Sequence, residues 1–104
     1  MAGSEKFLVW IFPVVVRKLW ERYSEAPLKE ILQIVRDLLA TRALEGKKAP
    51  FPYAPGVLLL TVEEQTTQGP YRISPLYELA TLDHAVEVLD VGVVELEAGD
   101  DATG

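Results

Sequence analysis

The sequence has no cysteine and only one histidine among its 104 residues. The absence of cysteine excludes disulfides, thiolate metal sites and cysteine nucleophiles. A single histidine, His84, with scattered carboxylates does not make a metal-binding constellation. A glycine-rich phosphate loop is also absent. We therefore expect no metal and no cofactor, and a cytoplasmic location fits the cysteine-free composition.

Long hydrophobic runs are also lacking. The longest, FLVWIFPVVV at residues 7–16, is about half the length needed to cross a bilayer. Glu5 spoils the basic leader of a signal peptide, and RKLWERY follows the run where a small-residue cleavage site would stand. We expect neither a membrane span nor export by this segment.

Positive charge is scarce in the second half of the chain. Residues 1–48 carry 9 basic and 6 acidic side chains (+3), residues 49–104 carry 1 basic and 10 acidic (−9), and together they give the net charge of −6. This split is found on ordinary acidic, soluble surfaces. It also disfavours phosphate chains and attracts basic polypeptide. We therefore expect a protein partner, with nucleic acid an unlikely one.

The first half of the sequence predicts a strand followed by two helices. Residues 6–12 are rich in β-branched and aromatic side chains and stop at Pro13, which suits the first turn of a helix. Apolar residues then recur at helical spacing through residues 13–45, interrupted near Ser24, a candidate N-cap. Gly46 is placed as a C-cap of the second helix.

The second half predicts strands. Residues 57–64, 71–79 and 85–97 follow a period of two or are apolar throughout, and a stiff loop with three prolines precedes them. Pro75 cannot donate to a ladder, so it indicates an edge strand or a bulge. The predicted fold is α+β in the order β-α-α-β-β-β, with a helical hairpin packed on a small, mainly antiparallel sheet. One domain spans residues 1–104, with an ordered core over about 6–97 and a frayed tail.

Three segments carry a resemblance to a known family: GPYRISPLYEL at residues 69–79, VEVLDVGVVE at residues 86–95, and FLVWIFPVVVRKLWERY at residues 7–23. In this order they resemble the third strand, the fourth strand and the first strand and helix of the RelE/ParE superfamily of bacterial toxins, including its HigB-like members. The resemblance covers roughly residues 6–97. It implies the fold described above.

The resemblance also implies what the chain has lost. Ribonuclease members of this family cleave ribosome-bound mRNA with basic and tyrosine side chains on the sheet. Their third-strand arginine matches Arg72, but their fourth-strand basic pair falls on Val93 and Val94, and their C-terminal tyrosine falls near Asp100. Lost proton-transfer groups typically cost about 10²–10⁴ in rate each. Arg72 is then the sole candidate catalytic residue, and an ion pair with Glu63, Glu64 or Glu78, a phosphate contact and a partner contact are its alternative roles.

A partner surface is predicted on the last strand, where apolar and acidic residues alternate and an edge would invite strand addition. Its predicted members are Glu87, Val91, Val93, Glu95, Leu96 and Glu97. The leading interpretation is a toxin-like protein of a toxin–antitoxin system that binds protein without catalysis. Its partner would be an antitoxin-like chain or a second copy of itself. The alternatives are an mRNA interferase with a relocated active site, and a small adaptor or assembly subunit unrelated to toxins.

Overall fold

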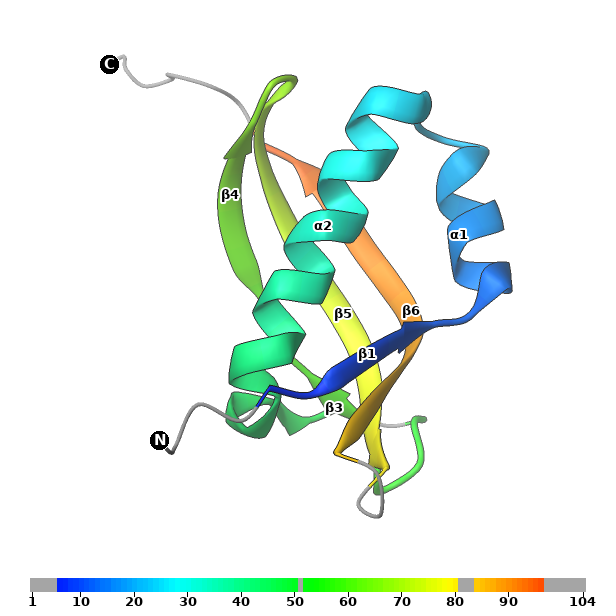
Figure 1. Ribbon diagram of the computed structural model, residues 1–104, viewed down its shortest axis with the longest axis vertical. Coiled ribbons are helices and arrows are strands. Elements are labelled where there is room, and N and C mark those ends of the chain that lie inside the picture. Colours follow the sequence, from blue (N-terminus) through cyan, green and yellow to red (C-terminus); the bar gives the residue numbers. More distant parts are fainter. Residues whose placement is uncertain (1–5, 51, 81–83, 97–104) are drawn as a thin grey trace.

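The computed structural model describes residues 6–50, 52–80 and 84–96, and shows two helices packed on one face of a single sheet (Figure 1). The elements are β1 (Leu8–Ile11), α1 (Pro13–Trp20), α2 (Glu25–Arg42), the 3-10 turn η1 (Ala43–Glu45), β2 (Lys47–Lys48), β3 (Leu58–Leu59), β4 (Val62–Thr66), β5 (Gly69–Ala80) and β6 (Ala85–Glu95). The predicted α+β class and the helical hairpin are confirmed. Neither described helix is long and apolar enough to cross a membrane.

The sheet is mainly antiparallel, as predicted. Its strand order is β1-β6-β5-β3-β2, and β4 pairs with β5 beside β3. Only β1 and β6, the first and last of the described strands, run parallel, and they lie side by side. The strand expected over residues 57–64 is two strands, because β3 ends at Leu59 and β4 begins at Val62. The short strand β2 was not predicted.

Pro75 lies in the middle of β5, which is a central strand and not an edge. Its carbonyl accepts a hydrogen bond from the Leu60 N–H at 3.3 Å, in the interval between β3 and β4. A strand residue turns its nitrogen and its C=O to the same side. The nitrogen of Pro75, which has no hydrogen to donate, therefore faces the interval between β3 and β4, where the ladder is interrupted. The register against β6 does shift between Leu76 and Tyr77, but the extra residue lies in β6, so this bulge does not come from Pro75.

Helix α2 forms because its apolar residues recur at helical spacing and cover the sheet. The buried residues of the helix are Pro27, Leu28, Ile31, Val35, Leu38 and Leu39. Ser24 occupies the N-cap position, but its side chain makes no capping hydrogen bond. Gly46 was predicted as the C-cap of the second helix, but Ala43 caps α2, and Gly46 caps the 3-10 turn η1 with extended backbone, at a φ of −65°.

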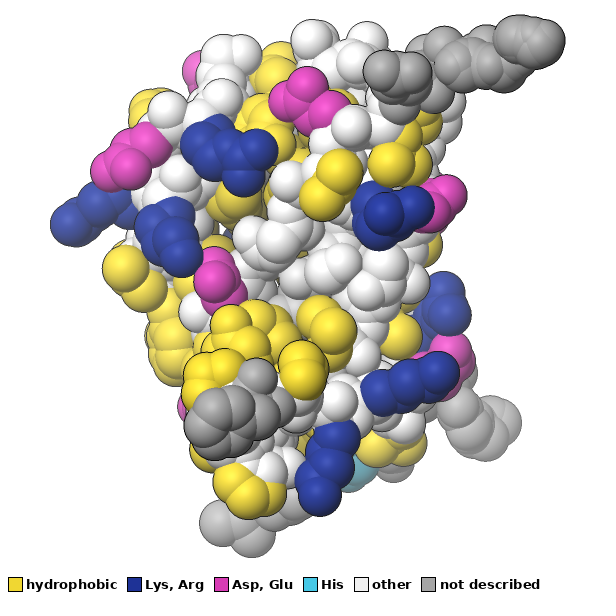
Figure 2. Space-filling view, turned by 180° about the vertical axis from the view of Figure 1, so that it is seen from behind, with side chains coloured by type: hydrophobic (Ala, Val, Ile, Leu, Met, Phe, Trp, Pro, Cys, Tyr) yellow, Lys and Arg dark blue, Asp and Glu magenta, His cyan; other side chains and the backbone are white. Residues whose placement is uncertain are grey.

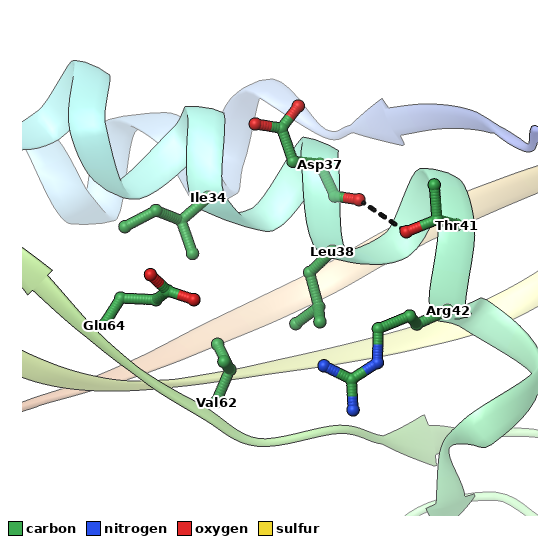
Figure 3. Close-up of a pocket in the computed structure, with 7 residues that line it drawn as sticks. All are labelled: Ile34, Asp37, Leu38, Thr41, Arg42, Val62 and Glu64. Atoms are coloured by element: carbon green, nitrogen blue, oxygen red, sulfur yellow. Dashed lines mark hydrogen bonds between the residues drawn. The ribbon is translucent and has the colours of Figure 1, made fainter.

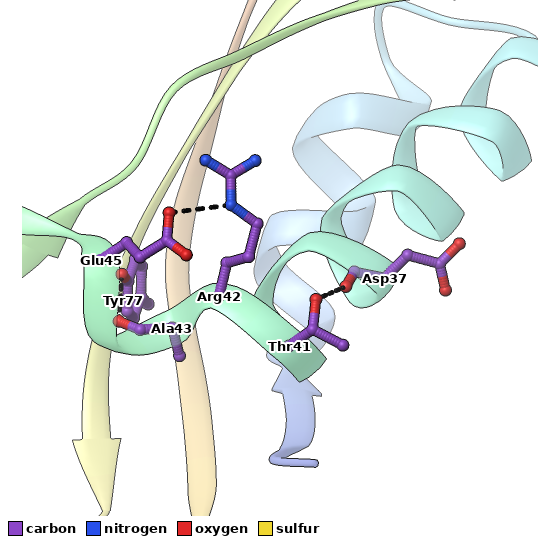
Figure 4. A network of polar contacts seen from close by, with 6 residues as sticks. All are labelled: Asp37, Thr41, Arg42, Ala43, Glu45 and Tyr77. Carbon is purple, nitrogen blue, oxygen red and sulfur yellow. Dashed lines mark hydrogen bonds and ion pairs between the residues drawn. The ribbon is translucent and has the colours of Figure 1, made fainter. Parts of the chain in front are cut away.

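Gly46 instead leaves room for a buried tyrosine. A Cβ at Gly46 would collide with the hydroxyl and Cζ of Tyr77. The Tyr77 hydroxyl donates a hydrogen bond to the carbonyl oxygen of Ala43 at 2.6 Å, which ties the end of the helical hairpin to β5 (Figure 4). This contact fixes α2 over the sheet where the chain turns into β2.

Candidate functional site

Arg72 projects from β5 on the face of the sheet opposite the helices, which we call the open face. Its Nη2 lies 2.8 Å and its Nε 3.0 Å from Oε2 of Glu63, the residue paired with it on β4. The two side chains are 46% and 57% exposed. The predicted sheet ion pair is therefore present, with Glu63 as its carboxylate. A pair this exposed contributes at most about 1 kcal/mol to folding.

The residue beside Arg72 on β6 is Val94, which is 53% exposed. Val93 points to the opposite side and is buried in the core. Of the two valines, Val94 therefore lies next to Arg72 on the open face. The cation at this point has an aliphatic neighbour on one side and a carboxylate on the other. Asp100 lies outside the described residues.

The rest of the open face carries neutral, acidic and basic groups. The hydroxyls of Thr61 and Ser74 lie 2.9 Å apart, and Glu78 is directly opposite Glu87. Figure 2 shows this side of the molecule, with Lys and Arg side chains scattered over it and not joined into a stripe.

The predicted partner residues of the last strand do not form one surface. Glu87 is half-buried on the open face, whereas Val91 and Val93 are 7% and 6% exposed and pack in the core beneath the helices. Their placement on a surface was wrong. The physical reason is the bulge. Tyr77 pairs with Val88 and Leu76 with Asp90, so the extra residue Leu89 reverses the alternation of β6.

The remaining predicted residues lie at the end of β6. Glu95 is exposed and Leu96 is half-buried, with the Leu96 N–H donating to the Pro70 carbonyl at 2.9 Å. Glu97 lies outside the described residues. The strand is also not an edge along its whole length, because β1 pairs with Ala85–Val88.

A cleft between α2 and β4 was not found from the sequence. It has a volume of about 260 Å³ and is lined by Ile34, Asp37, Leu38, Thr41, Arg42, Val62 and Glu64 (Figure 3). Leu38 and Arg42 point from the helix toward the strand, and Val62 and Glu64 point back toward the helix. Arg42 bonds Glu45 through its Nε at 2.9 Å (Figure 4). The floor of this cleft is apolar and its rim is polar.

Three buried tyrosines line the helix-facing side of the sheet or contact it. Burial is the main cause that raises the pKa of Tyr23, Tyr71 and Tyr77 above the ordinary value of 10.0, and the nearby carboxylate of Glu95 adds to the increase at the first two. The Tyr23 hydroxyl is buried without a hydrogen-bond partner among the described residues. Each of these phenols is held in its neutral form by the folded chain.

We expect the free energy of unfolding to fall as the pH rises above about 10. An unfolded tyrosine loses its proton near its ordinary pKa of 10.0, whereas the folded chain holds the proton to a higher pH. The unfolded state then binds fewer protons, so stability decreases with pH in this window and is fully retained below it. Urea unfolding at pH 8, 10 and 11 measures the decrease. Tyr77→Phe should flatten it, and an unchanged slope in this variant would contradict the assignment.

No protein-family model and no curated protein matches this sequence. Among solved structures, a chain of the RelBE2 toxin–antitoxin complex from Mycobacterium tuberculosis matches 88% of this chain and 95% of its own length, at 18% identity and a TM-score of 0.58. A free E. coli RelE toxin variant, with two arginines replaced by alanine, matches 90% of this chain and 87% of its own length, at 13% identity and a TM-score of 0.50. The chain therefore has a RelE-like toxin fold.

Proposed function

We propose that this chain is the toxin-like protein of a toxin–antitoxin pair, that it acts in the cytoplasm, and that it acts by binding protein and not by cleaving RNA. The fold supports the first part, because both matched structures are of toxins or of a toxin–antitoxin complex. The second part rests on one observation. Arg72, the one basic residue of β5, is already bound to Glu63, and Val94 stands beside it.

The chemistry of RNA cleavage explains why this observation matters. The reaction needs donors or cations aimed at the pentavalent phosphorus and groups that transfer protons to and from oxygen. Arg72 is the only lysine or arginine after residue 48. If Arg72 were freed from Glu63, it would still be the one cation in residues 49–104, which carry ten carboxylates. A site of this composition favours a basic polypeptide over a phosphate chain.

The test is mRNA cleavage in a translating extract. We expect the purified protein to leave mRNA intact, and Arg72→Ala to behave in the same way, because neither protein has the groups that the reaction needs. Primer extension across the message measures the cuts, and an active ribosome-dependent ribonuclease added to the same extract is the positive control. Codon-specific cuts that disappear in Arg72→Ala would overturn the proposal and establish an mRNA interferase with a relocated active site.

A further inference from the structure

Among the segments of the sheet that have a side no described strand covers are β4 and the end of β6. The Pro75 carbonyl faces the β3–β4 side of β5, and the Pro70 carbonyl faces β6. The backbone N–H and C=O groups of the residues between them therefore point alternately toward β4 and toward β6. Tyr71 and Ile73 therefore bond to their partners on β4, which leaves the N–H and C=O groups of Glu63 and Gln65 pointing outward. By the same alternation, Val91, Val93 and Glu95 point outward from β6.

The edge of β6 is partly protected by its own side chains. The Val91 N–H donates to Oδ1 of Asp90 at 2.9 Å, and the same oxygen lies 3.2 Å from Nζ of Lys18 on α1. A side chain that occupies an edge N–H hinders the approach of another strand. Among the described residues, no side chain accepts a hydrogen bond from the outward N–H groups of Glu63 and Gln65.

The edge of β4 also has the cleft beside it. Val62 and Glu64 face α2, so the side chains of a strand added alongside, about 4.8 Å away, would enter the space between β4 and the helix (Figure 3). Leu38, Ile34 and Val62 offer an apolar surface there, and the volume of about 260 Å³ accommodates one aliphatic side chain. The ion pairs of the described residues do not include Glu64.

We infer that the β4 edge and the α2–β4 cleft together take an extended segment of a partner as an added strand. The segment has an aliphatic residue opposite Val62 and a lysine or arginine opposite Glu64, two positions apart. Its backbone bonds the outward groups of Glu63 and Gln65, its aliphatic side chain fills the cleft, and its cation meets the carboxylates of Glu64 and Asp37. Main-chain bonds and alternate side-chain pockets are the two components of strand addition.

The source of this segment, an antitoxin-like chain, rests on the proposed function, but its test does not need that chain. The probes are two capped heptapeptides, Ser-Thr-Lys-Thr-Ile-Thr-Ser and Ser-Thr-Ile-Thr-Lys-Thr-Ser, which present the pattern for antiparallel and parallel pairing. The control replaces lysine by glutamate. NMR titration of the whole chain measures amide shifts, hydrogen exchange and Kd. If neither peptide binds, the result of the mRNA-cleavage test still stands. If mRNA is cleaved, the result of the peptide titration still stands.

We expect one of the two probes to shift the amides of Glu63 and Gln65 most and to slow their hydrogen exchange. The glutamate control should bind at least about tenfold more weakly, a difference of about 1.4 kcal/mol. Gln65→Pro removes an outward N–H without breaking the β5 ladder, and should raise Kd at least about tenfold, whereas Gln65→Val, which keeps the N–H, should stay within about twofold. Thr41→Trp, on the exposed rim of the cleft, should also raise Kd.

Three results would overturn the inference. The first is a failure of the peptide test, in either of two forms. Neither probe shifts the amides at millimolar concentration, or the Gln65→Pro variant keeps a native amide spectrum and an unaltered Kd. The second is a shift centred on Val93 and Glu95, which would place strand addition at β6. The third is a dimer of the chain alone in which the Gln65 amide already exchanges slowly, which would make a second copy the occupant.

Discussion

Gly46→Ala should lower the free energy of unfolding by about 3 kcal/mol. The new methyl group would overlap the Tyr77 hydroxyl and ring, and overpacking of a tight site costs roughly 1–3 kcal/mol. Moving the ring away would also break its hydrogen bond to Ala43, a loss worth about 1 kcal/mol. Backbone strain plays no part, because φ at this position is −65° and suits any residue. Urea unfolding at pH 7 gives the value.

Gly92→Ala is the matched control for this variant. A Cβ at Gly92 lies 3.7 Å from the Ser74 carbonyl oxygen and 3.8 Å from its Cβ, which are ordinary contacts. Its effect should stay within about 0.5 kcal/mol, as for most surface substitutions. Equal effects of the two changes would show that Tyr77 does not depend on the space that Gly46 leaves.

Ile31→Ala should cost about 3–4 kcal/mol. Ile31 is fully buried at the middle of α2, and removal of its side chain leaves a cavity between the helix and the sheet. Leu44→Ala is the comparison, because Leu44 is 73% exposed and should lose less than about 0.5 kcal/mol. Thermal and urea unfolding of both variants measure the difference. A loss below 1 kcal/mol in Ile31→Ala would mean that α2 can settle into the vacated space, and would contradict the rigid packing of the hairpin on the sheet.

The elements themselves could be predicted because each carries a strong local signal. The apolar stripe of α2 keeps the helical period along the helix, and the side chains of β5 alternate with a period of two along the strand. The ion pair of Arg72 was also within reach, since a hairpin turn between β4 and β5 brings Glu63 opposite it. Local periodicity and a short turn were sufficient for these features.

The errors arose where a single residue changes the geometry. The extra residue in β6 reverses which side chains face the core, and no period-two pattern announces where such a bulge falls. Gly46 was correctly singled out as special but for the wrong reason, because its need for space comes from Tyr77, far away along the chain. The α2–β4 cleft likewise joins residues of distant segments and has no local motif. Tertiary packing decides all three.

The pairing of β1 with β6 sets the order of events during biosynthesis. Strand β1 leaves the ribosome well before its partner, Ala85–Val88, is made. Until then the helical hairpin has no complete sheet to cover, and the apolar side chains of β1 and of the hairpin remain accessible. Long-range pairing of this kind is slow to form. A nascent chain is therefore a better target for chaperones and proteases than the finished protein, and a chain stopped before residue 85 cannot complete the fold.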